Sequence, residues 1–285
     1  MRDEKVKSLS EFISVVSQTR RLWKVDQKKE LWFRGERKRH ETVLRPKLYR
    51  PKKDKPMKPI SELLEMENLL YDEFERCGHQ LCQEKLEEED RYWDWYFLMQ
   101  HHGTPTRLLD WSDGALIALH FALQNKQKGD SDDAYVYVLE PYRMRDQINA
   151  LPEIEMAEQS WGRYIEKHPF HKSREDEWEY AYLPSDEEDL KELPIPKVPL
   201  PLHFPHITRR VAAQRSRFMV FGTDPFWLSA ALEKGDAPLK EIAIEARCVP
   251  EIKIELRDNG VTESVIFPDL DGLGREMNQL FEAWK

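Results

Sequence analysis

The sequence lacks any run of apolar residues long enough to span a bilayer, which needs about 18 in a row. The N-terminus, Met1 to Lys5, is not followed by the apolar stretch of a secretory signal peptide. Cysteine is scarce, since only Cys77, Cys82 and Cys248 occur in 285 residues. So few cysteines, in odd number, give no disulfide framework and predict reduced thiols. Together these absences predict a cytoplasmic protein without a membrane partner.

Net positive charge is also missing. The chain carries a formal charge of −9, and 34% of its residues are charged. An acidic, well-solvated surface argues against a protein that coats nucleic acid, so we expect no nucleic acid partner. A hydrophobic content of 40%, with nine tryptophans, is enough to fill a substantial core. The composition predicts an ordered chain of one large or two small domains.

The first forty residues show one helical and one extended pattern. Ser8 and Glu11 form a capping box ahead of apolar residues at helical spacing, which predicts a helix near residues 9–19. Leu31-Trp32-Phe33 is a short β-prone run that ends in a turn at Gly35. We therefore expect a helix followed by a strand.

A basic, proline-containing segment separates this strand from a second helix. Residues 47–58 resist both helix and sheet, so they are predicted to form an exposed loop. The helix after it begins at Ser61 and ends near Gly78. Its apolar face is predicted to carry residues spaced by three or four: Leu63, Met66, Leu70, Phe74 and Cys77.

The centre of the chain, from Arg91 to Leu123, has the pattern of a helix, a loop and a short strand, followed by another helix. Asp113 is predicted to cap that helix, whose small residues suit close packing on a sheet. The alternation in Ala134 to Leu139 predicts a strand. The acidic and then proline-rich stretch 168–202 is predicted to be a long excursion without regular structure.

Order is predicted to return after residue 207. Two strands and two helices are expected there: Arg217 to Phe221, Glu241 to Ala246, Pro250 to Gly260, and Leu270 to Trp284. Strands and helices do not alternate regularly along the chain. The sequence thus predicts a single-domain α+β fold with a central, mostly antiparallel sheet and helices at its N-terminal side.

Several blocks, in order along the chain, resemble the FRG domain family, which is named for the triplet present here as Phe33-Arg34-Gly35. The resemblance implies an FRG domain over residues 25–275, with 168–202 as an insertion loop. A helical segment over 1–24 precedes it, and a helix end over 276–285 follows. The other blocks are Leu44-Arg45-Pro46 to Arg50, Gln100 to Trp111, Ala118 to Ala122, Arg210 to Phe218, and Gly260 to Leu273, which contains Phe267-Pro268-Asp269-Leu270.

The order of these blocks is also similar to the ADP-ribosyltransferase superfamily. That similarity implies a related fold, a nucleotide pocket of the NAD or ADP-ribose type, and NAD as the candidate substrate. An arginine such as Arg34 suits a pyrophosphate because its planar fork makes two charge-assisted hydrogen bonds. The predicted ligand-binding residues are Arg34, Gly35, Thr104, Thr106 and Arg107, and the predicted catalytic residues are Gln214, His102 and Asp110.

Gln214 stands where the superfamily has a glutamate. An amide can bond to a ribose hydroxyl but stabilises a developing positive charge less well than a carboxylate does. Proton transfer is then left to His102 or Asp110. The chain is either an NAD-dependent transferase or glycohydrolase, or a non-catalytic module that senses a nucleotide. A third hypothesis is a protein-interaction domain in a bacterial defence or toxin system.

The predicted site residues also have structural alternatives. Arg34 could form a salt bridge to Asp110 or Glu36 that stabilises the sheet, and Arg107 could form an internal pair with Asp110. No metal is predicted, because Cys77, His79 and Cys82 with the neighbouring histidines lack the usual zinc spacing.

Overall fold

The computed structural model describes residues 5–82, 91–126, 129–168, 177–204 and 208–284. Within these ranges, six strands form one sheet in the order β4-β5-β2-β1-β3-β6, and every neighbouring pair is antiparallel. This confirms the predicted α+β class with an antiparallel sheet. The strands are β1 (Trp32–Glu36), β2 (Leu108–Ser112), β3 (Ala134–Leu139), β4 (Leu200–Leu202), β5 (Ser216–Val220) and β6 (Leu239–Ile244).

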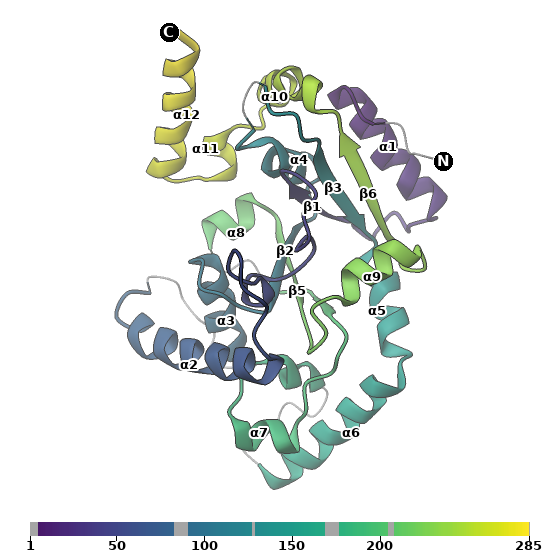
Figure 1. Cartoon of the computed structure of the whole chain (residues 1–285), viewed down its shortest axis with the longest axis vertical. Helices are drawn as coiled ribbons and strands as arrows, with labels where there is room; N and C mark the ends of the chain where they lie inside the picture. Colours follow the sequence, from purple (N-terminus) through teal and green to yellow (C-terminus); the bar gives the residue numbers. More distant parts are fainter. Residues whose placement is uncertain (1–4, 83–90, 127–128, 169–176, 205–207, 285) are drawn as a thin grey trace.

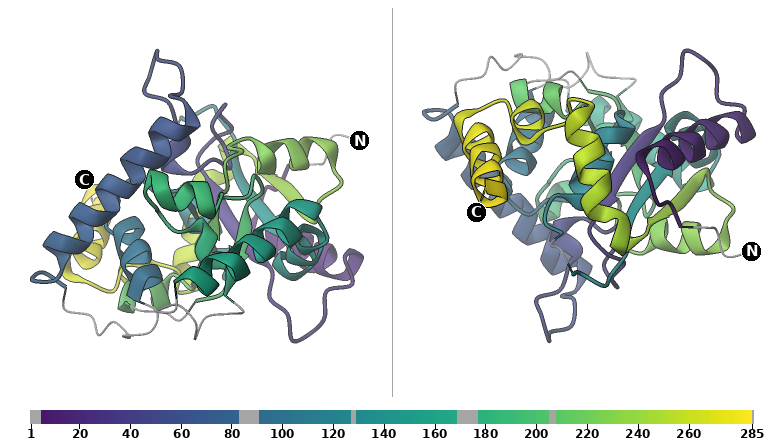
Figure 2. Two further views of the ribbon diagram at one scale, coloured as in Figure 1. Left: turned by 90° about the horizontal axis from the view of Figure 1, so that it is seen from below. Right: turned by 90° about the horizontal axis from the view of Figure 1, so that it is seen from above.

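Helices lie at both ends of the sheet (Figure 1). Near β3 and β6 are α1 (Leu9–Leu22) and α10 (Val249–Asp258), while α2 (Ile60–Gly78) and α3 (Arg91–His101) lie at the β2 and β5 end. Figure 2 shows these two groups from opposite sides. The remaining helices are α4 (Ala115–Leu123), α5 (Pro141–Asn149), α6 (Pro152–Lys167), α7 (Glu187–Glu192), α8 (Arg209–Ala213), α9 (Trp227–Lys234), α11 (Glu263–Ile266) and α12 (Leu270–Trp284).

The two faces of the sheet bury separate cores, as the alternation of side chains along a strand requires. Phe33 of β1 packs with α1, α4 and α10 on one face. Its neighbour Trp32 packs on the other face with α2, α3, α5 and α6. In β3, Val136 and Val138 face the first core, whereas Tyr137 faces the second. β1 and β3 therefore lie between two helical layers.

The Ser8 half of the capping box predicted for the first helix is present, whereas the Glu11 carboxylate accepts from the backbone N–H of Lys7. The Ser8 side chain accepts a hydrogen bond from the backbone N–H of Glu11, at 3.2 Å, and the helix begins at Leu9. It continues to Leu22, three residues beyond the predicted end. Its buried Phe12 packs in the core with α4 and α10. Local periodicity was enough to predict this element.

The second helix has the predicted length and part of the predicted buried face. Leu63 is buried, together with Leu64, Glu67 and Tyr71. The predicted residues Leu70 and Phe74 pack against the core, whereas Met66 and Cys77 are exposed. Apolar residues recur at three- and four-residue spacings on two adjacent sides of this helix, so periodicity could not choose between them. The chosen side is the one that brings Glu67 into the core.

The predicted exposed loop at 47–58 is wrong at its start. Residues Lys47–Tyr49 form a 3₁₀ turn (η1) that buries Leu48 and Tyr49. The Tyr49 hydroxyl donates to the backbone carbonyl of Gly222, at 2.7 Å. The basic, proline-containing composition of this segment gave no indication that Leu48 and Tyr49 are buried.

The predicted cap of the helix after β2 is also wrong. Gly114 is the N-cap residue of α4 and makes no side-chain cap. Asp113 instead binds Arg215, and its Oδ2 lies 2.5 Å from Nη2 of Arg217. The carboxylate thus joins the end of β2 to β5 rather than satisfying the helix N-terminus.

The stretch 168–202 is more ordered than its composition predicted; its residues 169–176 lie outside the described ranges. It contains a 3₁₀ turn at Trp178–Tyr182 (η3), α7 and β4. Trp178 and Tyr182 are buried, and Leu200 pairs with Val220 across the edge of the sheet. Aromatic residues between the acidic and proline-rich parts hold this stretch against the core.

In the described part of the chain, no helix combines the length and the apolar character needed to cross a bilayer.

Candidate functional site

A cleft of about 560 Å³ opens where β1, β2 and β5 meet α4, α8 and the loop after α3. Five of the eight predicted site residues line it: Arg34, Gly35, Thr104, Asp110 and Gln214. They come from segments up to 180 positions apart in the chain, since Gln214 lies 180 residues after Arg34. The sheet order explains this, because β1 and β2 are neighbours and β5 follows β2.

The other three predicted residues lie elsewhere. His102 lines a separate apolar pocket with Phe74 and Trp95. Thr106 is buried and donates its hydroxyl to Oε1 of Gln100, at 2.5 Å. Arg107 is fully buried and is absent from the cleft wall. These residues are close in sequence to Asp110 but do not line its cleft.

Arg107 belongs to a buried ion pair beneath the cleft. Its Nε lies 2.5 Å from Oε2 of Glu67, and both side chains are 0% exposed. Its Nη2 donates to the carbonyl of Tyr182, and its Nη1 to that of Phe221, at 2.7 and 3.2 Å. The adjacent carboxylate raises the pKa of Arg107 against the opposing effect of burial. Arg107 pairs with Glu67, and not with Asp110 as the sequence suggested.

Arg34 lines the cleft, but protein acceptors occupy each of its three nitrogens. Nε and Nη2 donate to Oε1 of Glu36, at 3.0 and 2.7 Å, and Nη1 donates to the backbone carbonyl of Asp110, at 2.7 Å. Burial alone would raise the pKa of Glu36, but the Arg34 guanidinium, together with His40 and Arg50, outweighs it and holds that pKa at about 2. Arg34 thus fixes β1 against β2 and keeps an ionised carboxylate in the cleft wall.

Gly35 is required by packing. A Cβ atom there would collide with the carbonyl oxygen of Ala118 and lie 2.6 Å from the amide nitrogen of Ala122. Helix α4 therefore crosses β1 at the glycine with almost no space between the backbones. The sequence suggested that this glycine admits a ligand; in the structure it admits a helix.

Asp110 reaches solvent in the cleft although protein atoms surround it on most sides. Desolvation raises its pKa, against the opposing charge of Arg34 and the hydrogen bond from Gln100. The amide Nε2 of Gln100 donates to Oδ2 of Asp110, at 2.8 Å. Since the same Gln100 side chain accepts from Thr106, its orientation is fixed and so is that of the carboxylate.

The cleft also carries cations that the sequence reading did not select. Its lining contains Arg34, Arg37, Lys47, Arg50 and Arg210, which are five cationic side chains against the two carboxylates Glu36 and Asp110. Both Arg50 and Arg210 lie inside sequence blocks that carried the family resemblance. Those blocks could have pointed to Arg50 and Arg210 as site residues. They did not show which arginines keep hydrogen-bond donors without a partner.

Arg50, Arg210 and Gln214 have hydrogen-bond donors that bond to no acceptor in the described part of the protein. Among the described residues, Nε of Arg210 and Nε2 of Gln214 are buried without a hydrogen-bond partner. Arg50 donates Nε to the carbonyl of Arg45, at 2.8 Å, and no acceptor in the described ranges takes its terminal N–H groups. Burial lowers the pKa of both Arg50 and Arg210. Buried donors of this kind are rare and mark a place for an acceptor.

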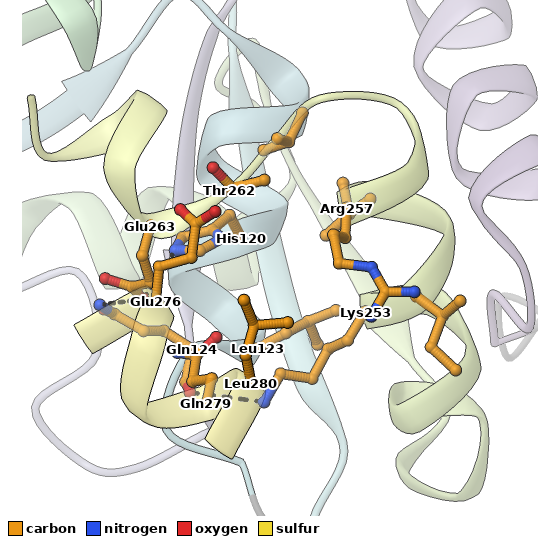
Figure 3. A pocket seen from close by; sticks show the side chains of 13 residues that line it. His120, Leu123, Gln124, Lys253, Arg257, Thr262, Glu263, Glu276, Gln279 and Leu280 are labelled. Carbon is orange, nitrogen blue, oxygen red and sulfur yellow. Dashed lines mark hydrogen bonds and ion pairs between the residues drawn. The ribbon is translucent and has the colours of Figure 1, made fainter. Parts of the chain in front are cut away.

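A second cavity of about 180 Å³ lies among α4, α10 and α12 (Figure 3). Its polar side chains bond mainly to one another or to the backbone. Oε1 of Glu263 accepts from Nε2 of Gln124, at 2.8 Å, and Lys253 lies 3.2 Å from the carbonyl of Lys126. These contacts fasten α10 and α11 to the end of α4, so we read this cavity as structural.

Among the described residues, no group of three or more histidine, cysteine, aspartate or glutamate side chains could hold a metal ion.

Comparison with known proteins finds a family match for part of the chain. The model of the FRG domain matches residues 29–131, so this part carries an FRG domain, as the sequence motifs led us to expect. The match includes Arg34, Arg50 and Asp110, whereas Arg210 and Gln214 lie outside it. No curated protein and no solved structure matches the chain.

Proposed function

We propose that the cleft binds the pyrophosphate group of a nucleotide of the NAD or ADP-ribose type. The observation that carries this proposal is the pair of buried donors without partners, Arg210 Nε and Gln214 Nε2. Leaving such donors unsatisfied costs about 1–3 kcal/mol each, and a phosphate oxygen is a strong acceptor for both. Arg50 supplies further N–H groups on the same cleft.

Charge and size support the same ligand class. The five cationic and two acidic side chains of the cleft contrast with a chain of net charge −9. A cleft of positive sign on an acidic protein concentrates anions. Its volume of about 560 Å³ suits a small-molecule ligand, and Phe121 and Phe218 offer apolar surface to a base. The similarity of the sequence blocks to ADP-ribosyltransferases favours the same choice.

Turnover is the second part of the proposal. In hydrolysis of NAD, a water oxygen bonds to C1′ of the ribose as the bond to the nicotinamide nitrogen breaks, and the water proton passes to a base. Asp110 is the candidate base, because desolvation moves its pKa upward and Gln100 holds its carboxylate in the cleft. Gln214 in place of a glutamate favours the alternative, a module that binds the nucleotide without turnover.

A thermal melt with NAD, ADP-ribose and ATP in turn tests the binding proposal. Ligand at about 100 times its dissociation constant adds about 2.7 kcal/mol to the free energy of unfolding. We expect this gain in the wild type and in Arg209→Ala, since Arg209 is exposed on the same helix and outside the cleft. Arg210→Ala should lose it. No shift in a folded wild type would refute the proposal.

Nicotinamide release then separates an enzyme from a sensor. Turnover by the wild type that is lost in Asp110→Asn, with ligand binding retained, would support Asp110 as the base. Binding without any release of nicotinamide in the wild type would establish the sensor instead.

A further inference from the structure

The aromatic ring of Phe267 contacts two guanidinium groups. The guanidinium carbon of Arg210 is 4.7 Å from the ring centroid, and that of Arg275 is 4.5 Å from it. Phe121, which lines the cleft, meets the same ring edge-on, with centroids 5.9 Å apart and planes at 87°. Phe267 is buried, at 6% exposure.

We propose that Phe267 is a positioning residue that holds Arg210 in the cleft with its hydrogen-bond donors unused. This inference rests on the proposed function for its purpose, although the arrangement itself can be measured without a ligand. Phe267 belongs to the Phe-Pro-Asp-Leu segment at 267–270, which lies outside the matched domain range of 29–131. The proposal thus gives this closing segment a part in the site.

The argument turns on how an arginine is held. Arg34 is held by hydrogen bonds to Glu36 and to the carbonyl of Asp110, and these bonds engage each of its three nitrogens. Arg210 is held instead by a cation–π contact with the Phe267 ring, which needs no hydrogen-bond acceptor. Within the described residues its Nε has no acceptor. An arginine held in this way is positioned while its donors remain for a phosphate.

The position of the Phe267 ring is fixed by contacts of its own backbone. The amide of Phe267 donates to the carbonyl of Glu263, at 2.8 Å, and Gly272 packs so closely that a Cβ there would collide with the carbonyl oxygen of Phe267. Arg275, the second cation at the ring, donates Nε to Oε2 of Glu263, at 3.1 Å. Glu263 therefore holds the Phe267 segment through its backbone carbonyl and Arg275 through its buried carboxylate.

Glu263 connects this assembly to the cleft. Its other oxygen accepts from Gln124, and His120 lies 3.2 Å away; Figure 3 shows these side chains beside the smaller cavity. Gln124 ends α4, the helix whose Ala118 and Phe121 line the cleft. The ring that contacts Arg210 is consequently anchored to the same helix that forms one wall of the cleft.

The direct test is the mobility of the Arg210 side chain in the protein without ligand, measured as the ¹H–¹⁵N nuclear Overhauser effect of its Nε–Hε group. The signal is assigned by its loss in Arg210→Lys. We expect a rigid signal in the wild type and in Phe267→Tyr, which keeps the ring, and a mobile signal in Phe267→Leu and Phe267→Met. An equally rigid Arg210 in the last two variants, both folded by thermal melt, would overturn the proposal.

The matching functional readout is titration with ADP-ribose. Loss of a partly desolvated cation–π contact should weaken binding about tenfold in Phe267→Leu. The same change in an Arg210→Lys background should add less than about twofold, because its effect acts through Arg210. An undiminished effect in that background would overturn the positioning role. If the wild type binds neither ADP-ribose nor pyrophosphate, the proposed function fails, whereas the mobility measurement still decides this inference.

Discussion

The buried pair of Arg107 and Glu67 makes a prediction that separates a structural arginine from a ligand-binding one. Replacing Arg107 with leucine removes its contacts to Glu67, Tyr182 and Phe221. Among the described residues, the Glu67 carboxylate, 0% exposed, then keeps only the Tyr96 hydroxyl and the backbone N–H of residue 107 as donors. Breaking one partner out of a buried pair costs about 3–5 kcal/mol because it leaves a charge without compensation.

Equilibrium unfolding in urea measures this loss. Arg76→Leu is the matched control, since Arg76 also pairs with a glutamate but is 70% exposed, so its replacement should cost far less stability. Adding Glu67→Gln to Arg107→Leu should recover part of the loss, because the second change removes the uncompensated charge. A loss below about 1 kcal/mol in Arg107→Leu, combined with weaker nucleotide binding, would refute the structural role and restore Arg107 as a ligand residue.

Three further predictions concern the walls of the cleft. Gly35→Ala should be severely destabilised by collision with the Ala118 carbonyl, whereas Gly162→Ala, which meets no atom within 4 Å, should gain about 0.5–1 kcal/mol in a thermal or urea melt. The Glu36 pKa of about 2, against 4.5 when unfolded, means that its carboxylate stabilises the fold above pH 4.5 and that this contribution is lost as the pH falls toward 2. Glu36→Gln should therefore lose about 3 kcal/mol at neutral pH and much less near pH 2, and an equal loss at both would contradict the assignment. The pKa of Asp110 is raised, so its ionised form disfavours the fold above the pKa of the unfolded chain; Asp110→Asn should be more stable than the wild type at pH 7 and gain little near pH 3, and a variant less stable at pH 7 would refute this.

Local patterns predicted most of the secondary structure. The capping box and apolar periodicity placed α1, and the alternation in Ala134 to Leu139 placed β3, because each signal lies within one element. The buried face of α2 was predicted only in part, since neighbouring sides are similarly apolar and tertiary packing decides between them. The order in 177–204 was missed because composition averages over the few buried aromatic side chains, such as Tyr182, that hold a segment in place.

The site was predicted in part. Family blocks led to Arg34, Asp110 and Gln214, and the sheet brings all three to one cleft. Which arginine keeps its donors could not be read from the sequence, because it depends on partners far along the chain. The N–H groups of Arg34 bond to the carboxylate of Glu36, two residues later, and to the carbonyl of Asp110, 76 residues later. Arg107 bonds to the carboxylate of Glu67, 40 residues earlier in the sequence. Arg210 is held by the ring of Phe267, 57 residues later in the sequence, and this contact leaves its hydrogen-bond donors available.

The central claim is that Arg210 and its neighbours hold the phosphates of a nucleotide, and calorimetric titration with ADP-ribose tests it most directly. We expect saturable binding by the wild type. Removing one charged hydrogen-bonding group should weaken binding at least about tenfold in Arg210→Ala, at about 1.5–3 kcal/mol per bond, with Arg209→Ala unchanged. A folded wild type that gives no heat of binding with ADP-ribose, NAD or pyrophosphate, or an Arg210→Ala variant that binds as tightly as the wild type, would contradict the account.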